Sequence, residues 1–326
     1  GTIDLRSGEL RPHNPDDLIT KIAPVDYIPD AQAPTWEAFL HRIMDGNERL
    51  IAFLQRAVGY SLTGDTSERV LFILYGTGAN GKTTFLETLR ALLGDYGIQA
   101  PADTLLVGRE NAVPNDIARL RGARFIAVSE ISEGRRLAEV LVKSLTGRDT
   151  ITARFLYSEF FEFRPEGKIW LATNHKPIIR GTDKAIWDRI RLIPFTVTIP
   201  EAEQDKHLVE KLKRELPGIL AWAVRGCLEW QTSGLGVPEE VRSATEAYRA
   251  EMDVIGAFIA DRCILSAGAR VKAGDLYEAY RKWCEENKEE PLNKIAFGLR
   301  LAERGLVSER DMHARYWRGI GLLTDT

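Results

Sequence analysis

The chain of 326 residues contains few cysteines and histidines and no long apolar run. Its three cysteines, Cys227, Cys263 and Cys284, are far apart and form no C-x-x-C pair. This spacing argues against a cysteine zinc site and is typical of proteins of the reducing cytoplasm. No segment approaches the roughly 18 uncharged apolar residues of a membrane-spanning helix, so we expect a cytoplasmic protein that does not use a membrane. Because the chain begins at Gly1 and not at a methionine, we also expect a fragment of a longer protein.

A strong net charge is absent too, but the charges are unevenly distributed. The formal net charge is −3, whereas residues 117–191 contain 15 Lys or Arg against 9 Asp or Glu. A basic segment inside an acidic chain indicates a path for a polyanion. A solvated surface of mixed charge is the alternative that composition leaves open.

The most specific pattern is a glycine-rich loop between an apolar strand and an amphipathic helix. Residues 70–75 read as a buried strand, and residues 76–83 match G-x-x-x-x-G-K-[ST]. The glycines let the backbone curl its N–H groups around a polyphosphate, Lys82 brings a positive charge to the β- and γ-phosphates, and the Thr83 hydroxyl can bind Mg²⁺. The sequence therefore predicts a site for ATP and Mg²⁺. The predicted nucleotide-binding residues are Gly76, Thr77, Gly78, Ala79, Asn80, Gly81, Lys82, Thr83 and Thr84.

Three further apolar strands follow this loop. They are expected at residues 123–128, 168–174 and 190–195, and helical or hairpin segments separate them. Strands connected in this way indicate an α/β fold with a parallel sheet, in which ligands bind at the carboxyl ends of the strands. The nucleotide is therefore expected at that edge.

Polar residues at the ends of two of these strands are candidates for the chemistry. Glu130 and Asn174 are expected to join Lys82 around one γ-phosphate. Glu130 is the candidate general base, which polarises the attacking water and helps to hold the metal, and Asn174 is a neutral sensor of the phosphate. The alternatives are that Glu130 is an ordinary surface glutamate and that Asn174 only forms a turn. His175 is the only histidine beside the site.

One arginine lies too far along the chain to complete the site of its own subunit easily. Arg189 follows the loop PIIRGTDKAIWD. An arginine finger supplied by a neighbouring subunit can stabilise the charge that develops during phosphoryl transfer. We therefore expect Arg189 to act on the next copy, with an ordinary surface arginine as the alternative.

The ordered motifs resemble those of a known superfamily. The series GTGANGKT, FIAVSE, KIWLATN and WDRIRLIPF is similar to the Walker A, Walker B, sensor and arginine-finger motifs of superfamily 3 helicases. Within that superfamily the chain most resembles the helicase part of phage- and plasmid-type primase-helicases, which are related to the poxvirus primase-helicase. The resemblance extends to the lead-in segment GELRPHNPDDLITK and covers about residues 1–250.

The resemblance implies an ATP-hydrolysing DNA helicase that acts in replication. It implies a P-loop AAA+-like core, a hexameric ring of identical subunits, and single-stranded DNA drawn through the centre with 3′-to-5′ polarity. By family position the catalytic residues are Lys82, Glu130, Asn174 and Arg189. Many members have two acidic residues at the end of the Walker B strand, whereas this chain has Ser129 before Glu130. The predicted metal ligands are therefore Thr83 and Glu130, with waters.

The segment ITARFLYSEFFEF predicts a β-hairpin and resembles the DNA-contacting hairpin of the family. Lys or His is common near its tip, whereas this chain has Arg154 and Tyr157 in that region. Arg154 is expected to meet a phosphate and Tyr157 to stack on a base, and stacking contributes roughly 1–3 kcal/mol per base. Lys143 in the preceding predicted helix is a third DNA-binding candidate. The alternative for most aromatic residues of the segment is the core of the hairpin itself.

The flanking regions predict further domains. A hairpin is expected at residues 2–13, a proline-rich loop at residues 12–34, and two short helices after it. The last part of the chain predicts three helices, with a turn at Gly268 between the first two, and a final strand pair, which is typical of a winged helix. The predicted domains are a lead-in region (1–64), the helicase core (65–200), a helical subdomain (201–251) and a winged-helix-like domain (252–326).

Two other functions share the phosphate-binding loop. A replication initiator or loader would use ATP as an assembly switch without processive unwinding, and a small-molecule kinase would need an acceptor pocket and a lid with clustered arginines. The trailing Arg189 favours a ring ATPase over a kinase. The partners expected for a helicase are single-stranded or forked DNA, further copies of the chain, and a primase domain or protein.

Overall fold

The computed structural model describes residues 1–107, 115–181, 184–312 and 314–323. The chain divides into two compact units, Gly1–Tyr248 and Arg249–Thr326, and each is considered by itself. Within the described ranges, no helix is long and apolar enough to cross a bilayer. The four-part domain division expected from the sequence stays a prediction.

The first unit begins with the predicted hairpin. β1 (Thr2–Asp4) pairs antiparallel with β2 (Glu9–Arg11). Gln231 donates a hydrogen bond from Nε2 to the backbone oxygen of Leu5 at 2.7 Å. The hairpin is thus attached to a helix more than 200 residues further along the chain.

The proline-rich loop and the two short helices after it also agree with the prediction. α1 (Pro34–Ile43) begins with a proline at its first position, and α2 (Glu48–Ser61) begins after Asn47, whose side-chain oxygen accepts hydrogen bonds from the N–H groups of Arg49 and Leu50. Such N-caps satisfy backbone donors that have no partner inside the helix. The short 3-10 helices of this unit are Pro15–Asp17, Gly94–Tyr96, Ala102–Leu105 and Glu201–Glu203.

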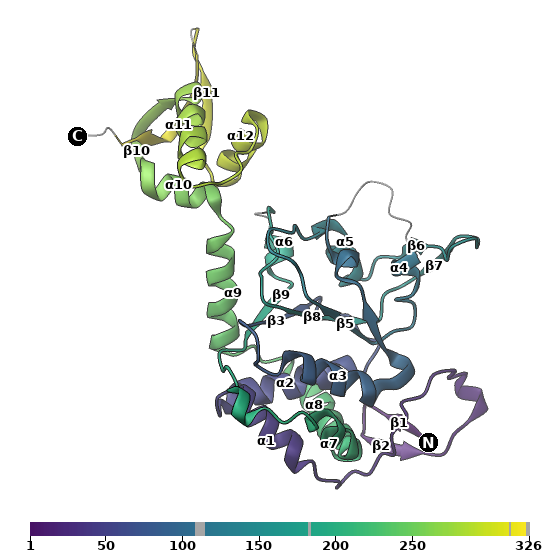
Figure 1. Ribbon diagram of the computed structural model, residues 1–326. Helices are drawn as coiled ribbons and strands as arrows, with labels where there is room; N and C mark the ends of the chain where they lie inside the picture. Colours follow the sequence, from purple (N-terminus) through teal and green to yellow (C-terminus); the bar gives the residue numbers. More distant parts are fainter. Residues whose placement is uncertain (108–114, 182–183, 313, 324–326) are drawn as a thin grey trace. The chain divides into compact units, whose positions relative to one another are not determined.

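A parallel sheet of five strands forms the centre of the first unit (Figure 1). Its strand order is β4-β5-β8-β3-β9, which confirms the predicted fold class. The strands are β3 (Leu71–Tyr75), β4 (Gly97–Ala100), β5 (Phe125–Ser129), β8 (Lys168–Thr173) and β9 (Ile190–Pro194). Only β4 was not predicted, because this edge strand is four residues long and has little apolar pattern.

Helices cover both faces of the sheet. α2 and α3 lie on one face with α1, α7 and α8 beyond them, and α4, α5 and α6 lie on the other (Figure 1). Their bounds are α3 (Lys82–Leu93), α4 (Asn115–Ala118), α5 (Glu139–Leu145), α6 (Lys184–Trp187), α7 (Leu208–Arg214), α8 (Leu216–Ser233) and α9 (Glu239–Glu251). α7, α8 and α9 lie within residues 201–251, where the sequence predicts a helical subdomain.

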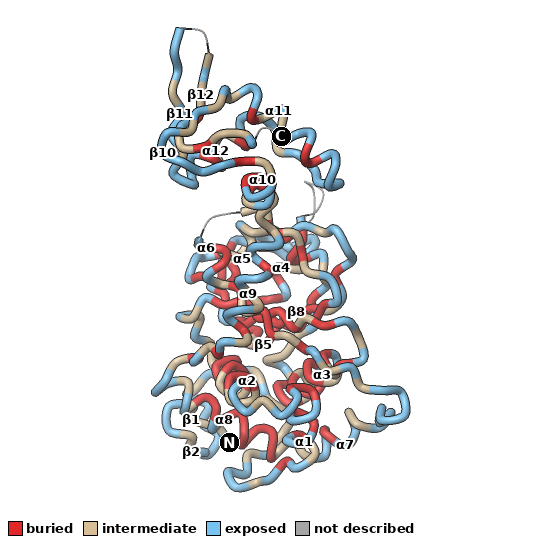
Figure 2. The backbone as a smooth tube through the Cα atoms, turned by 90° about the vertical axis from the view of Figure 1, so that its left-hand side faces the viewer, coloured by how far each residue is buried: buried red, intermediate tan, exposed pale blue. Residues whose placement is uncertain are grey.

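The core of this unit lies between the sheet and the helices α2, α3 and α8, where buried backbone concentrates (Figure 2). Trp170 of β8 stacks on Phe72 of β3 with ring centroids 4.3 Å apart, and its indole N–H donates to Ser61 at 3.1 Å. α2 and α8 approach closely at Gly59, where a Cβ atom would lie 2.1 Å from the backbone nitrogen of Cys227. A larger residue there would push the two helices apart.

The predicted hairpin after α5 is present. β6 (Ile151–Ala153) pairs antiparallel with β7 (Phe161–Phe163). Phe163 is buried, but the side chains of Leu156, Tyr157 and Phe160 are 54%, 99% and 60% exposed. The alternative that most aromatic residues here form a hairpin core is therefore wrong for the tip, because only three residue pairs form the ladder and the tip lies beyond them.

After the end of α9, the described residues of the second unit form three helices and a three-stranded antiparallel sheet of order β10-β12-β11. Its elements are α10 (Val254–Arg262), β10 (Cys263–Lys272), α11 (Ala273–Glu286), α12 (Lys294–Glu303), β11 (Val307–Arg310) and β12 (Arg315–Leu322). The predicted turn at Gly268 is wrong, because Gly268 lies within β10, at a register shift between Leu265 and Arg270. The glycine marks an irregularity in a strand, as isolated glycines often do.

Candidate functional site: the carboxyl edge of the sheet

A cavity of about 660 Å³ lies at the carboxyl edge of the sheet. Residues 78–84, 129–132 and 172–175 line it, so the loop after β3 and the ends of β5 and β8 contribute together. This volume is within the usual range for small-molecule sites. Lys82, Thr83, Glu130 and Asn174 all belong to the lining, so the structure brings together the predicted residues of this edge.

The loop after β3 needs glycine at two positions for different reasons. A Cβ atom on Gly76 would lie 2.2 Å from the Asn80 side chain and 2.4 Å from the backbone oxygen of Phe195. Gly81 has φ +83°, a left-handed conformation, directly before α3. The loop therefore reaches the N-terminus of α3 by a path that other residues would strain, and backbone N–H groups at a helix N-terminus favour anions.

Lys82 is a buried cation whose hydrogen-bond partners among the described residues are all neutral. Its Nζ donates hydrogen bonds to the backbone oxygen of Gly76 at 2.8 Å, to Oδ1 of Asn80 at 2.7 Å and to Oδ1 of Asn174 at 3.0 Å. Burial lowers the pKa of Lys82 to about 8. All three acceptors are neutral, so a phosphate in the adjoining cavity would supply the negative charge that favours the protonated amine.

Asn80 and Asn174 shape this site through their side chains. Asn80 accepts from Lys82 and donates from Nδ2 to the backbone oxygen of Phe195 at 3.4 Å, so it ties the loop to the chain after β9. Asn174 follows β8, where the Thr173 hydroxyl accepts from the backbone N–H of His175 at 3.1 Å. The amide predicted to sense the phosphate therefore already contacts the lysine predicted to bind it.

Glu130 lies directly after β5 with a strained backbone. Its N–H donates to the backbone oxygen of Ala172 at 2.9 Å, its φ is +59°, and its side chain is exposed. Non-glycine residues in this conformation are uncommon and concentrate at functional sites. The turn places Glu130 in the cavity lining, on the neighbouring strand to the one that carries Asn174.

The donors at this edge suit a hard metal ion bound together with a nucleotide. The Thr83 hydroxyl and the Glu130 carboxylate both line the cavity, and Ser129 stands beside them, with its hydroxyl accepting from Gln99 at 3.3 Å. In the described part of the chain, no group of three or more His, Cys, Asp or Glu could hold a metal by itself. Mg²⁺ is commonly held by one or two protein oxygens together with phosphates and waters, so this donor set fits it.

Arg189 is not part of this cavity in its own chain. It precedes β9, where its backbone oxygen accepts from the N–H of Leu71 at the first residue of β3. Since β3 and β9 are parallel, Arg189 lies at the amino edge of the sheet, opposite the loop that follows β3. Its Nε donates to the Thr146 hydroxyl at 3.1 Å, and one Nη donates to the backbone oxygen of Ala185.

The three predicted DNA-binding residues lie on two elements. Arg154 follows β6 and its guanidinium lies 4.8 Å from the centre of the Phe160 ring. Tyr157 is almost fully exposed, with φ +61°, in the connection between β6 and β7. Lys143 lies on α5 and not on the hairpin. Arg154 and Tyr157 thus belong to one exposed tip, and Lys143 does not.

Some lining residues were not predicted as part of the site. Ser132 and Thr173 lie in or beside the turns that follow β5 and β8. Their signal in the sequence is weak, because a single hydroxyl residue near the end of a strand is common in loops. Only the register of the neighbouring strands shows that they meet the glycine-rich loop.

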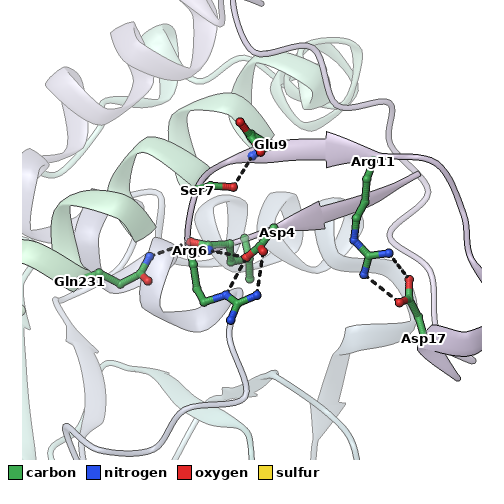
Figure 3. Close-up of polar contacts among 8 residues, drawn as sticks. Asp4, Arg6, Ser7, Glu9, Arg11, Asp17 and Gln231 are labelled. Atoms are coloured by element: carbon green, nitrogen blue, oxygen red, sulfur yellow. Dashed lines mark hydrogen bonds and ion pairs between the residues drawn. The ribbon is translucent and has the colours of Figure 1, made fainter.

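A larger cavity of about 1070 Å³ lies beneath the N-terminal hairpin. Two ion pairs lie among its charged side chains: Arg6 meets Asp4 at 2.9 Å and Arg11 meets Asp17 at 2.8 Å (Figure 3). Hydrogen bonding to Arg6 lowers the pKa of Asp4 to about 2. The smaller cavity is the candidate nucleotide site because a glycine-rich loop, a helix N-terminus and a buried lysine meet there.

Comparison with known sequences shows similarity along most of the chain. The family described as "D5 N terminal like" matches residues 1–45, a family of unknown function (DUF5906) matches residues 74–189, and the family described as "Poxvirus D5 protein-like" matches residues 250–316. The first and third matches flank the parallel sheet, and the second contains three of its five strands, β4, β5 and β8, in full.

Curated relatives come from large DNA viruses. The chain is 29% identical over 314 residues to a provisionally named helicase of Acanthamoeba polyphaga mimivirus, covering 88% of this chain and 32% of the relative. It is 28% identical over 257 residues to a provisionally named helicase of Frog virus 3, covering 72% and 26%. A provisionally named primase of African swine fever virus is 25% identical over 314 residues, covering 85% and 30%. The chain spans about a third of the length of these relatives.

Solved structures with a similar fold include the C-terminal region of NrS-1 in its apo state. One such structure has a TM-score of 0.55 at 11% identity, covering 93% of this chain and 80% of that chain. A second has a TM-score of 0.54 at 13% identity, covering 75% and 58%. At these identities the likeness concerns the fold alone.

Proposed function

Since this chain belongs to the poxvirus D5-like primase-helicase family, we propose that it is an ATP-dependent DNA helicase that acts in replication. It binds ATP with Mg²⁺ at the carboxyl edge of its sheet, assembles with further copies, and moves on single-stranded DNA with 3′-to-5′ polarity. The single observation that carries the proposal is Lys82, a buried cation that is held by three neutral oxygens and lines a cavity.

The residues of the cavity divide the work of hydrolysis. The N–H groups at the start of α3 and the Lys82 ammonium bind the β- and γ-phosphates. Glu130 accepts a proton from the attacking water, and Asn174 moves from Lys82 toward the γ-phosphate, whose oxygens compete for the same lysine. Thr83 and Glu130 would hold Mg²⁺, and the ion would supply positive charge to the phosphates when it is bound.

Residues from one subunit do not complete this site. Arg189 lies at the opposite edge of the sheet from Lys82, so a ring in which the amino edge of one copy faces the cavity of the next places each arginine on a neighbouring nucleotide. The lining comes from only three segments of one chain, with no second set of residues that resembles an acceptor pocket among those that line the cavity. This arrangement favours a ring ATPase over a kinase.

Subunit mixing tests the assignment. Arg189→Ala alone is expected to lower the DNA-stimulated ATPase rate by about 10³- to 10⁵-fold, the usual effect of losing an arginine finger. An excess of Lys82→Ala subunits, which are inactive themselves but retain Arg189, is expected to restore part of this rate. Near-normal ATPase activity of Arg189→Ala, or no recovery on mixing, would remove the inter-subunit site.

The exposed tip between β6 and β7 is the proposed DNA contact. Arg154 supplies a positive charge for a phosphate, and Tyr157 offers an exposed ring for stacking. Arg154→Ala is expected to preserve DNA-independent ATPase activity and to uncouple hydrolysis from strand separation, whereas Tyr157→Phe keeps the ring and is expected to unwind. Equal unwinding by Arg154→Ala and the parent protein would exclude the tip from the mechanism.

The second unit has the element order of a winged helix, and we propose that fold for it. Its arginines are largely paired: Arg300 meets Glu303 at 2.8 Å, and Arg318 meets Glu309 at 2.9 Å. On α12, Ile295 and Leu299 are 79% and 62% exposed. An apolar outer helix face and paired arginines favour a protein partner, such as a primase domain, over direct DNA binding by this unit.

A further inference from the structure

α5 holds the segment that joins Asn174 to Arg189 at two places. At its first residue, Oε1 of Glu139 accepts from the backbone N–H groups of Arg180 and Gly181 at 2.9 and 2.8 Å. Just past its last residue, the hydroxyl of Thr146 accepts from Nε of Arg189 at 3.1 Å. α5 and α6 lie on the same face of the sheet (Figure 1). One short helix therefore touches both the chain after the predicted sensor and the predicted finger.

Thr146 makes a directed contact. It is 3% exposed, and its hydroxyl donates to the backbone oxygen of Val142 at 2.7 Å. A hydroxyl has a single proton to donate, so donation to Val142 leaves its lone pairs for the Arg189 guanidinium. The position of the hydroxyl is thus fixed by the helix, and the arginine is bonded to a rigid point.

The free arginine side chain is long and has many rotamers. Ordering such a side chain has a large entropic cost, and a misplacement of about 1 Å near the reacting phosphate can lower a rate about a hundredfold. Arg189 also donates to the backbone oxygen of Ala185, so its two contacts come from different elements. The contacts with Thr146 and Ala185 together set the direction of the Arg189 guanidinium plane.

We propose that Thr146 is a positioning residue for Arg189, whose hydroxyl holds the guanidinium in the orientation that serves the nucleotide site of the neighbouring copy. The inference rests on the proposed trans role of Arg189. It adds that α5 already orients Arg189 at the amino edge of the sheet in the isolated subunit, before the subunit assembles with a neighbour that binds nucleotide. The effect of Thr146 must therefore appear in the subunit that donates the arginine and not in the subunit that hydrolyses ATP.

The subunit-mixing assay, carried out with the full chain, tests whether Thr146 acts in the subunit that supplies Arg189. Subunits that carry Arg189→Ala hydrolyse ATP only with an arginine from donor subunits that carry Lys82→Ala. Adding Thr146→Val to the donor removes the acceptor at nearly constant volume, and we expect it to lower the recovered rate at least about tenfold, as for a hydrogen bond to a charged group. Thr146→Ser in the donor keeps the hydroxyl and is expected to restore recovery.

Two control variants distinguish a loss of Arg189 positioning from a general loss of structure. Thr146→Val placed in the Arg189→Ala subunit, which has no arginine to orient, is expected to leave recovery unchanged. Thr88→Val in the donor removes a hydroxyl that is likewise buried and bonded to the i−4 carbonyl, at 2.8 Å, but lies on α3, and it is also expected to have no effect.

The outcomes distinguish this inference from the function on which it rests. If Thr146→Val donors restore the rate as well as donors with Thr146, or if Thr146→Val lowers recovery equally in both subunits, the positioning role is wrong while the trans arginine stands. If donors with intact Thr146 give no recovery, both proposals fail.

Discussion

Two buried lysines lie at opposite edges of the same sheet, and their difference shows what marks a functional site in this molecule. Lys82 follows β3 at the carboxyl edge, and Lys168 begins β8 at the amino edge. They are 6% and 2% exposed, and burial lowers their pKa values to about 8 and about 7. Burial and a lowered pKa are thus common to both.

The surroundings of the two amines differ. Lys168 donates to the backbone oxygens of Thr63 and Glu166, and its Nζ lies 4.6 Å from the centre of the Tyr60 ring. These contacts enclose it. Lys82 is also held by oxygens, but it lines a cavity beside a helix N-terminus. Access to a cavity beside a helix N-terminus, and not the pKa, separates the lysine proposed to bind phosphate from the enclosed lysine.

The largest expected effect follows from this contrast. Lys82→Ala removes the ammonium group that is proposed to bind the β- and γ-phosphates. It is expected to lower ATPase activity at least about 10³-fold. Lys168→Met keeps the cavity intact and is expected to retain activity within about threefold, because its site is closed to nucleotide. Steady-state ATPase rates of the two purified variants, both folded by circular dichroism, provide the measurement. Loss of activity in Lys168→Met, in protein that still folds, would break the comparison.

Glu130 tests whether the carboxyl edge performs chemistry beyond binding. Glu130→Gln is nearly isosteric but cannot accept the proton of water, so kcat is expected to fall by about 10²- to 10³-fold. The KM for ATP is expected to change little. Glu133→Gln, an exposed residue outside the cavity lining, is the matched control and should behave like the parent protein. A change in KM with unchanged kcat would assign Glu130 to binding.

Stabilisation of the protein by bound nucleotide should depend on Lys82 and not on Lys168. With Mg²⁺ and a non-hydrolysable ATP analogue at a hundredfold excess over Kd, the free energy of unfolding is expected to rise by about 2.7 kcal/mol in the parent protein and in Lys168→Met. Lys82→Ala is expected to show little of this gain. Thermal unfolding with and without analogue measures it, and equal stabilisation of all three proteins would place the nucleotide elsewhere.

The smallest expected effect concerns Lys168 and pH. Its pKa is lowered from 10.5 to about 7 in the folded protein, so below pH 7 the lysine is protonated in both states and the cost of burying its charge is fully present. Between about pH 7 and 10.5 the unfolded chain binds more protons, so the free energy of unfolding rises with pH. From pH 7 to 9.5 the parent is expected to gain about 1–3 kcal/mol relative to Lys168→Met.

Urea unfolding at the two pH values measures this gain. Lys213→Met, at an exposed position on α7, is the control and should follow the parent protein. A parallel pH dependence of the parent and Lys168→Met would show that Lys168 keeps its ordinary pKa despite burial.

The sequence predicted the carboxyl edge well because its signals are local. The glycine-rich loop, Lys82 and the strand before them are contiguous, and the polar ends of β5 and β8 follow apolar runs that read clearly as strands. The parallel arrangement then brings Glu130 and Asn174 to the same edge. The contact between Lys82 and Asn174 spans 92 positions in the sequence, yet strand order alone makes it expected.

The amino edge was harder to predict because its contacts are not periodic. Thr146 meets Arg189 across 43 positions through a single hydroxyl at the end of a helix, and nothing in the local pattern marks that residue. β4 was missed because a short edge strand needs few apolar residues. The exposed tip after β6 was misjudged because aromatic residues usually indicate a core, whereas here Tyr157 and Phe160 stay exposed beyond a ladder of three residue pairs.

Strand displacement is the measurement that tests the proposed motor most directly. The protein, with ATP and Mg²⁺, is offered forks that carry either a 3′ or a 5′ single-stranded tail, with Lys82→Ala as the control. The proposed function predicts that the parent separates the fork with the 3′ tail and that Lys82→Ala separates neither. DNA-stimulated ATP hydrolysis by the parent without separation of either fork would contradict the motor and leave an ATP-dependent switch in its place.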